Sequence, residues 1–95
     1  MAAIGVLTLE LRLENSHSLK DKRHIVASLK ERLRHKFNVA VAEIDHQDLW
    51  QRAALAAVTV SSDHVHAEKV LRQVEEEAVS LLGPEVAEAT LEWLA

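Results

Sequence analysis

The stretch Leu7-Thr8-Leu9-Glu10-Leu11-Arg12-Leu13 decides the fold of this chain, because apolar and polar residues alternate in it without a break. Leucine occupies every second position, and threonine, glutamate and arginine stand between. Successive side chains of a strand point to opposite faces of a sheet, so the pattern predicts a strand that is buried on one face only. We therefore expect the elements that follow to cover the leucine face.

A helix is expected next, from Leu19 to about Lys36. Ser18 precedes it, and Asp21 follows three residues later, which resembles a capping box with aspartate in place of the usual glutamate. Apolar residues recur through the segment at helical spacing, at Leu19, Val26, Leu29 and Leu33, with Ile25 beside them.

Two β-branched segments, 37–45 and 53–61, then predict a second and a third strand, joined by a polar connection over 45–52. Both segments are apolar or small on both faces, so the pattern leaves open which side of each strand meets the helices. Ser62 or Asp63 is placed to cap a second helix, and Gly83-Pro84 ends it, since proline cannot continue a helix.

The tail allows two interpretations. Apolar Ala87, Ala89, Leu91 and Trp93 alternate with Glu88, Thr90 and Glu92, which favours a strand, while an Ala/Glu/Leu-rich helix from Pro84 is the alternative. The strand completes the order β-α-β-β-α-β, an α+β ferredoxin-like two-layer sandwich with an antiparallel sheet and two helices on one face. We expect a single such domain over residues 1–95, because the chain is too short for a second core.

Composition narrows the chemistry. Cysteine is absent, which excludes disulfides and thiolate chemistry, and Gly5 and Gly83 are the only glycines, which disfavours a phosphate-cradling loop. The sequence shows no basic leader and no apolar run long enough for a bilayer, so we expect a cytoplasmic protein. We recognise no P-loop, nucleophile elbow or zinc-helix motif, and expect no cofactor, no small-molecule substrate and no enzymatic activity.

Positive charge is concentrated in the expected first helix. Seven of the eleven lysines and arginines lie in 20–36, where only Asp21 and Glu31 oppose them. At 100° per residue, four of these cations fall within about 80° of one another beside the apolar stripe, namely Lys20, Arg23, Lys30 and Arg34. Lys22 projects toward the apolar side, and we expect its amine to extend along that surface to reach water.

This cationic stripe has two interpretations. One is a solvated helix face with local ion pairs. The other is a ridge that contacts phosphates or an acidic protein surface. The net charge of −4 argues against non-specific nucleic-acid binding and leaves a specific contact open.

The segment 43–52 holds the remaining candidates. Four of its side chains are of a type that binds metals, Glu43, Asp45, His46 and Asp48, but no second ligand cluster accompanies them, and we expect no metal. In the structural interpretation the acids cap turns and pair with Arg52, and Leu49 and Trp50 cover the sheet edge. If Trp50 is exposed instead, it is a partner anchor or a stacking surface.

Three stretches together are similar to one known family: Ser18-Leu19-Lys20-Asp21-Lys22-Arg23, Phe37-Asn38-Val39-Ala40-Val41-Ala42-Glu43 and Asp48-Leu49-Trp50-Gln51-Arg52-Ala53. With the later Ser61-Ser62-Asp63, they resemble the YlxP family of small bacterial proteins of uncharacterised function. The resemblance implies a ferredoxin-like fold. Genes of that family commonly lie beside those for translation initiation factor two and a ribosome-binding maturation factor, which implies a link to the ribosome. Where Asp21 stands, the family usually has glutamate.

The residues characteristic of that family, to which no activity is assigned, are here Leu19, Lys20, Lys22, Arg23, Glu43, Asp48, Trp50, Gln51 and Arg52.

The residues support three hypotheses. The first is a non-catalytic accessory protein that binds ribosomal RNA or an assembly factor through Lys20, Lys22, Arg23, Lys30, Arg34, Trp50 and Arg52. The second is a self-associating interaction module without RNA contact. The third is a small metal-assisted enzyme built on Asp45, His46 and Asp48. Apolar side chains on both faces of the strands at 37–45 and 53–61 also predict a homo-oligomer, because some of this surface remains after the helices pack.

Overall fold

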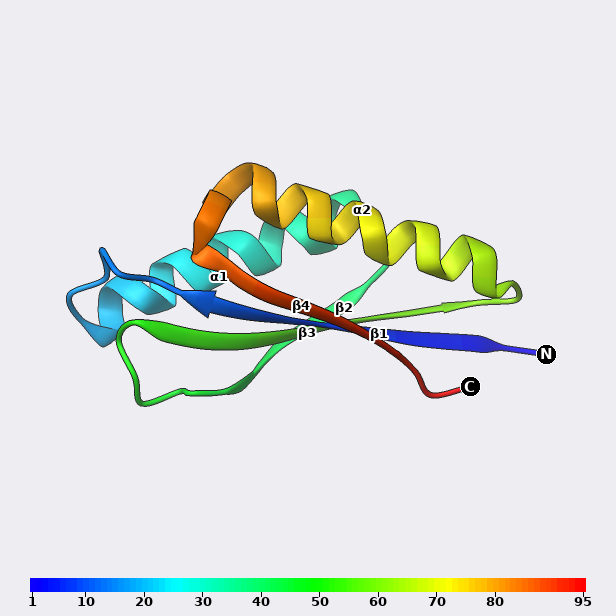
Figure 1. Cartoon of the computed structure of the whole chain (residues 1–95), viewed down its shortest axis with the longest axis horizontal. Helices are drawn as coiled ribbons and strands as arrows, with labels where there is room; N and C mark the ends of the chain where they lie inside the picture. Colours follow the sequence, from blue (N-terminus) through cyan, green and yellow to red (C-terminus); the bar gives the residue numbers. More distant parts are fainter.

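The computed structural model describes all 95 residues and shows two layers, one a sheet and the other a pair of helices (Figure 1). The elements are β1 (Ala3–Arg12), α1 (Leu19–Lys36), β2 (Ala40–Asp45), β3 (Arg52–Ser61), α2 (His64–Leu82), a 3-10 turn (Gly83–Glu85) and β4 (Val86–Trp93). The strand order is β2-β3-β1-β4, and every neighbouring pair is antiparallel. The predicted ferredoxin-like sandwich is confirmed, and the tail after Pro84 is a strand rather than a helix.

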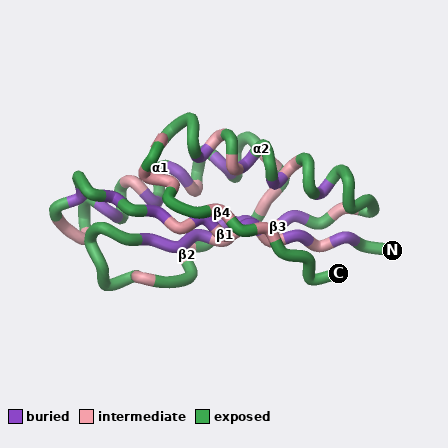
Figure 2. The backbone as a smooth tube through the Cα atoms, viewed as in Figure 1, coloured by how far each residue is buried: buried purple, intermediate pink, exposed green.

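β1 is the strand around which the sheet is built. It pairs with β3 from Ala3 to Arg12 without a slip, and with β4 on its other side, with one irregularity between Glu10 and Leu11. Its leucines are fully buried beneath the helices, whereas its even-numbered residues point away from them. Figure 2 shows burial concentrated where the sheet meets the helix layer. The alternation in the sequence therefore predicts correctly which residues of β1 face the core and which face away from it.

The register also settles which side of β2 and β3 faces the core. Leu7 lies opposite Ala57, and Ala57 lies opposite Val41, so these three side chains share the helix-covered face. Val58 and its partner Ala40 therefore point to the other side. A one-residue slip would exchange the two faces of a strand, so the long β1–β3 ladder fixes this choice.

Both helices begin where the sequence placed their caps. The Ser18 hydroxyl accepts a hydrogen bond from the Asp21 amide at 3.0 Å, and the Asp63 carboxylate accepts one from the His66 amide at 3.2 Å. The Asp21 carboxylate accepts from the amide of His17 at 3.1 Å, one residue earlier than a capping box prescribes. No helix of the chain is both long and apolar enough to cross a membrane.

An ion-pair cluster fastens the two helices to each other. Glu77 of α2 accepts a hydrogen bond from Lys36 Nζ at 2.7 Å, and its other carboxylate oxygen lies 3.2 Å from Arg32 Nε. The hydrogen bond from Lys36 lowers the pKa of Glu77 below its usual value, and the charges of Lys36 and Arg32 add to this effect, although partial burial opposes it. Glu77 is thus held in its charged form between two cations of α1.

The Glu77 cluster predicts a pH-dependent contribution to stability. Because the folded pKa of Glu77 is lowered, its contribution is present above the unfolded pKa of about 4.3 and is lost as the pH falls through the folded value. We expect Glu77→Gln to lower the melting temperature at neutral pH and to match wild type in strongly acidic solution. Circular dichroism melts across pH check this, with Glu76→Gln as the control, since Glu76 forms no ion pair. A deficit of the same size at neutral and at strongly acidic pH contradicts the assignment.

Candidate functional site

Lys22 is the only charged side chain in the core, where it is 1% exposed. Its Nζ atom donates to the carbonyl oxygens of His46 at 2.7 Å, Gln47 at 3.2 Å and Arg52 at 3.3 Å. An ammonium group carries three donors, so these carbonyls satisfy it. The prediction that this amine reaches water is wrong, because the first turn of α1 packs on the β2–β3 connection, whose carbonyls replace the water. Lys22 is therefore not available to contact a binding partner.

Glu43 of β2 supplies the charge that balances Lys22. Its Oε2 atom lies 3.0 Å from Lys22 Nζ, and its side chain is 18% exposed. This oxygen makes no well-directed hydrogen bond, so charge pairing is the contact that compensates its burial. Glu43 shares the core-facing side of β2 with Val41, which explains how a carboxylate in an apolar strand meets a lysine in an apolar helix stripe.

The turn beside this pair is built from local hydrogen bonds. His46 adopts a left-handed backbone conformation with φ of 64°. Its amide donates to Asp45 Oδ1 at 2.7 Å, and its carbonyl accepts from the Leu49 amide at 3.0 Å as well as from Lys22. The backbone of the turn is therefore ordered by both its own residues and α1.

Gln51 holds the other end of the connection. Its side-chain amide donates to the carbonyl oxygens of Glu14 at 3.2 Å and Ser16 at 3.3 Å, and its own carbonyl accepts from the Leu13 amide at 2.8 Å. The connection is thus tied to α1 by Lys22 and to the loop after β1 by Gln51. Sequence reasoning gave neither residue this role.

Leu49 and Trp50 lie between the two tied ends and face solvent. Trp50 is 54% exposed, and both residues line an open hollow of about 410 Å³ together with Asp48, Gln51 and Arg52. The prediction that Leu49 and Trp50 cover the sheet edge is therefore wrong. The tied backbone presents their side chains outward, which matches the alternative of an anchor or stacking surface.

The acids of the connection do not pair with Arg52. Its guanidinium Nη2 lies 3.7 Å from Glu10 Oε2 of β1 instead, and the same oxygen lies 3.5 Å from His46 Nε2. No group of three or more histidine, aspartate or glutamate side chains converges anywhere in the chain as a metal site would require. The geometry gives no support to the enzyme hypothesis based on Asp45, His46 and Asp48.

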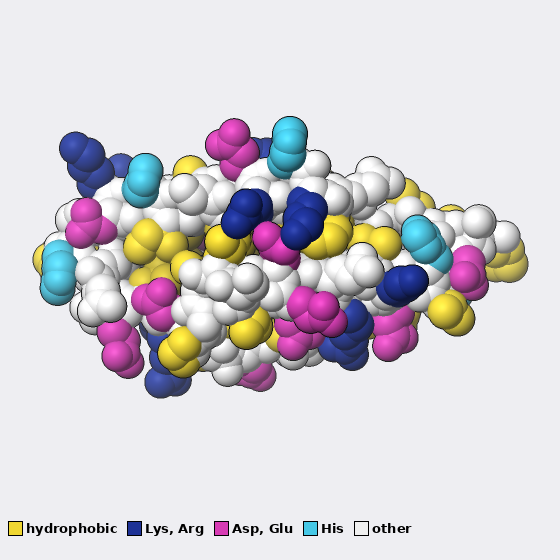
Figure 3. Space-filling view, turned by 90° about the horizontal axis from the view of Figure 1, so that it is seen from above, with side chains coloured by type: hydrophobic (Ala, Val, Ile, Leu, Met, Phe, Trp, Pro, Cys, Tyr) yellow, Lys and Arg dark blue, Asp and Glu magenta, His cyan; other side chains and the backbone are white.

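Four cations of α1 form what we call the cationic flank: Lys20, Arg23, Lys30 and Arg34. None of them forms an ion pair or a side-chain hydrogen bond, whereas Lys22, Arg32 and Lys36 on the same helix do. Lysine and arginine side chains project from the helix layer in Figure 3. The interpretation of local ion pairs therefore holds for the side of α1 that meets α2, and not for this flank.

The position of the cationic flank follows from helical geometry. At 100° per residue, it lies on the opposite side of the buried stripe from Arg32 and Lys36, which contact α2. Because α1 packs over β2, an edge strand, the flank overlooks that edge of the sheet. Lys22 ties the first turn of α1 to the connection, so Lys20 lies at the same end of the molecule as Trp50.

The helix-free side of the sheet, which we call the open face, is mostly apolar on β1, β2 and β3 and polar on the edge strand β4. The register places on it Ile4, Val6, Val58, Val60, Ala40 and Ala42. Charged residues occur on β1 and β3 only at one end, where Glu10, Arg12 and Arg52 lie. The edge strand β4 adds Glu88, Thr90 and Glu92 to this face. An antiparallel sheet that faces water is normally polar on that side, so the part of the open face formed by β1, β2 and β3 lacks the usual solvated surface.

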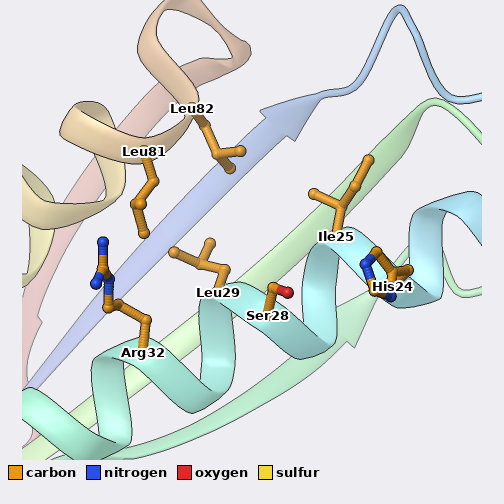
Figure 4. A pocket seen from close by; sticks show the side chains of 7 residues that line it. All are labelled: His24, Ile25, Ser28, Leu29, Arg32, Leu81 and Leu82. Atoms are coloured by element: carbon orange, nitrogen blue, oxygen red, sulfur yellow. The ribbon is translucent and has the colours of Figure 1, made fainter.

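A groove of about 500 Å³ runs between α1 and α2. Its lining is His24, Ile25, Ser28, Leu29, Arg32, Leu81 and Leu82. In Figure 4 the leucine side chains approach one another across the groove, with Arg32 toward one end and His24 toward the other. None of the family-characteristic residues lines it.

The fold is shared with a crystal structure at 1.50 Å of a dimeric ferredoxin-like protein of unknown function from Thermobifida fusca YX. The TM-score is 0.51 at 14% identity, over 97% of this chain and 91% of that chain. At this identity the likeness establishes the fold alone. The molecule is thus a ferredoxin-like α+β protein.

The chain belongs to the family described as protein of unknown function (DUF503), whose model matches residues 4–90. It is similar to the uncharacterized protein YlxP of Bacillus subtilis (strain 168), with 39% identity over 71 residues, which is 75% of this chain and 77% of that protein. The family resemblance read from the three sequence stretches is confirmed.

The Lys22 contacts predict a large and asymmetric effect on stability. Removing one partner of a buried pair leaves the other uncompensated, so we expect Lys22→Met to lower the free energy of unfolding by about 3 kcal/mol. Adding Glu43→Leu should recover part of this loss, since no buried charge then remains. Urea denaturation measures both variants, with Lys20→Met as the exposed control. Equal stability of Lys22→Met and Lys20→Met contradicts the assigned role.

Proposed function

We propose that this protein is a non-catalytic accessory protein that binds RNA through the cationic flank of α1, with the ribosome or an assembly intermediate as its setting. One observation carries the proposal. Six of the eleven basic side chains form no ion pair, and four of these six lie together on this flank. The other two, Arg12 and Lys69, lie elsewhere.

Unpaired cations on one flank can bind a polyanion, and their charges have no partner within the fold. They form no ion pair within the fold, whereas their binding to phosphates releases the counterions condensed on a nucleic acid, which is favourable in entropy. Lys20 and Arg34 are fourteen residues apart, which corresponds to about 21 Å of helix. This length lets the flank follow several phosphates of one strand.

The acidity of the remaining surface supports an oriented contact. Residues 20–36 carry a net charge of +5, so the rest of the chain carries −9 to give the overall −4. The acidic residues of α2 repel a nucleic acid, and the flank faces away from α2. A polyanion is therefore expected to approach from the side of the flank and not from the side of α2. The choice of the ribosome follows the family resemblance and forms part of the proposal.

The RNA proposal is tested by reversing charges on the flank. We expect Arg23→Glu with Arg34→Glu to weaken co-sedimentation with ribosomal subunits and to lower the salt slope of binding by about two, since each lost phosphate contact lowers it by about one. The matched control reverses Lys69 and Arg72 on the acidic helix α2, and melting temperatures verify folding. If wild type fails to sediment at low salt, or both double variants behave alike, the flank is only a solvated surface.

A second candidate function is self-association through the open face. Val60 is 59% exposed there, and the neighbouring residues of β1 and β2 are aliphatic. We propose a second copy of the chain as the occupant, in line with the dimeric state stated for the Thermobifida fusca relative of the same fold. Two sheets that stack face to face would bury this surface on both copies at once.

The size of the open face agrees with this occupant. β1, β2 and β3 have 10, 6 and 10 residues, and at about 3.3 Å per residue and about 4.8 Å between strands they cover roughly 410 Å² in projection. The accessible area is larger because the side chains stand up from the sheet, and a standard interface needs about 800 Å² from each partner. A dimer formed this way leaves the helix layer and its cationic flank free, so the two functions are compatible.

The dimer proposal has a matched pair of exposed valines for its test. Val60→Glu places a charge within the open face, so we expect a monomer of 10.6 kDa, where wild type has twice this mass. Val65→Glu on α2, where the valine is 77% exposed, should leave the dimer intact. Light scattering at high micromolar concentration measures the mass of each protein. Wild type that scatters as a monomer overturns the proposal.

A further inference from the structure

The two tryptophans of the chain lie in different surroundings. Trp93 packs edge-on against His64, with ring centroids 4.8 Å apart, and it lies against Gly5, where an added Cβ would come within 3.1 Å of the indole. Trp50 forms no aromatic pair, and its side chain is open to solvent. Its exposure therefore lacks an internal packing explanation.

The backbone that carries Trp50 is ordered in advance. Lys22 binds the carbonyls of three residues of the connection, and Gln51 binds the loop that follows β1. A binding group on such a backbone loses little conformational entropy when its ligand arrives. The backbone that carries Trp50 is thus held in place before a ligand arrives.

The hollow beside Trp50 matches the chemistry of a nucleobase. Leu49 and Trp50 provide apolar surface, and Asp48, Gln51 and Arg52 provide polar groups around it. A base has two flat π-faces and a polar edge, so it can stack on the indole while its edge meets polar side chains. The hollow of about 410 Å³ is large enough for one base.

Basic side chains lie on both sides of the hollow, where the phosphates of a bound RNA strand would be. Arg52 is 48% exposed and shares one face of its guanidinium with Glu10 Oε2 at 3.7 Å, and Arg12 lies directly opposite it in the β1–β3 register without an ion pair. Lys20, the first residue of the cationic flank, lies at the same end of the molecule. It precedes Lys22 by two residues, and the Lys22 amine donates to the carbonyl of Arg52. Phosphates on either side of a stacked base therefore have basic partners on both sides of the connection.

We infer that the hollow formed by residues 48–52 is a subsite for one unpaired base of single-stranded RNA, stacked on Trp50. The inference rests on the proposed RNA-binding function and narrows its substrate class. In a duplex the bases are already stacked within the helix and their faces are inaccessible, so a Trp50 platform favours single strands.

The test uses the intrinsic fluorescence of Trp50 in a Trp93→Phe background, where it is the only tryptophan. We expect a twelve-nucleotide oligouridine to quench this fluorescence, and an RNA duplex of equal length to leave it nearly unchanged. Trp50→Ala should weaken binding of the oligouridine by roughly 5- to 100-fold in fluorescence anisotropy, with the salt slope unchanged, because stacking releases no counterions. Trp50→Phe should retain most of the affinity.

The outcomes separate this inference from the proposed function. Oligouridine binding that depends on Arg23 and Arg34, but is unaffected by Trp50→Ala, overturns the subsite and preserves the flank. Absence of binding to both single-stranded and duplex RNA at low salt overturns both. A shift of Trp50 emission with protein concentration alone, without RNA, assigns Trp50 to contact between copies and also overturns the subsite.

Discussion

The contact between the Lys22 ammonium and the β2–β3 connection is the constraint on which the surface features of this protein depend. The amine binds the carbonyls of His46, Gln47 and Arg52, and Glu43 balances its charge. No other hydrogen bond or ion pair joins α1 to the connection. Lys22 thereby sets the position of Trp50 relative to Lys20, where the cationic flank begins.

A charged pair is a costly way to join two elements, because both groups lose their hydration. An apolar residue at the position of Lys22 would remove the one donor group that the carbonyls of His46, Gln47 and Arg52 share. The ammonium group therefore orients the carbonyls of an irregular backbone segment by hydrogen bonds, which methylene groups cannot form. This explains why a polar network occurs here, at the end of the sheet, while the centre of the core contains leucine, valine and alanine.

The sequence predicted the fold because the dominant signals are local. The alternation of residues 7–13 and the cap at Ser18 act within a few residues, and the structure agrees with both. The buried faces of β2 and β3 could not be predicted, since both sides are apolar and only the register with β1 distinguishes them. Lys22 was misread for a related reason. Its partners lie more than twenty residues away, and the available signal was a glutamate on the same side of its strand as Val41.

The lysines of this chain differ in chemical accessibility. The amines of Lys20, Lys30 and Lys69 are unpaired, whereas the amine of Lys22 is enclosed by carbonyl oxygens. Acylation requires a free, deprotonated amine, so a reagent or an acetyltransferase finds the first group and not Lys22 in the folded state. The reactivity of Lys22 therefore reports how often the connection separates from α1. Acetylation of Lys20 or Lys30 would remove charge from the flank while leaving the fold intact.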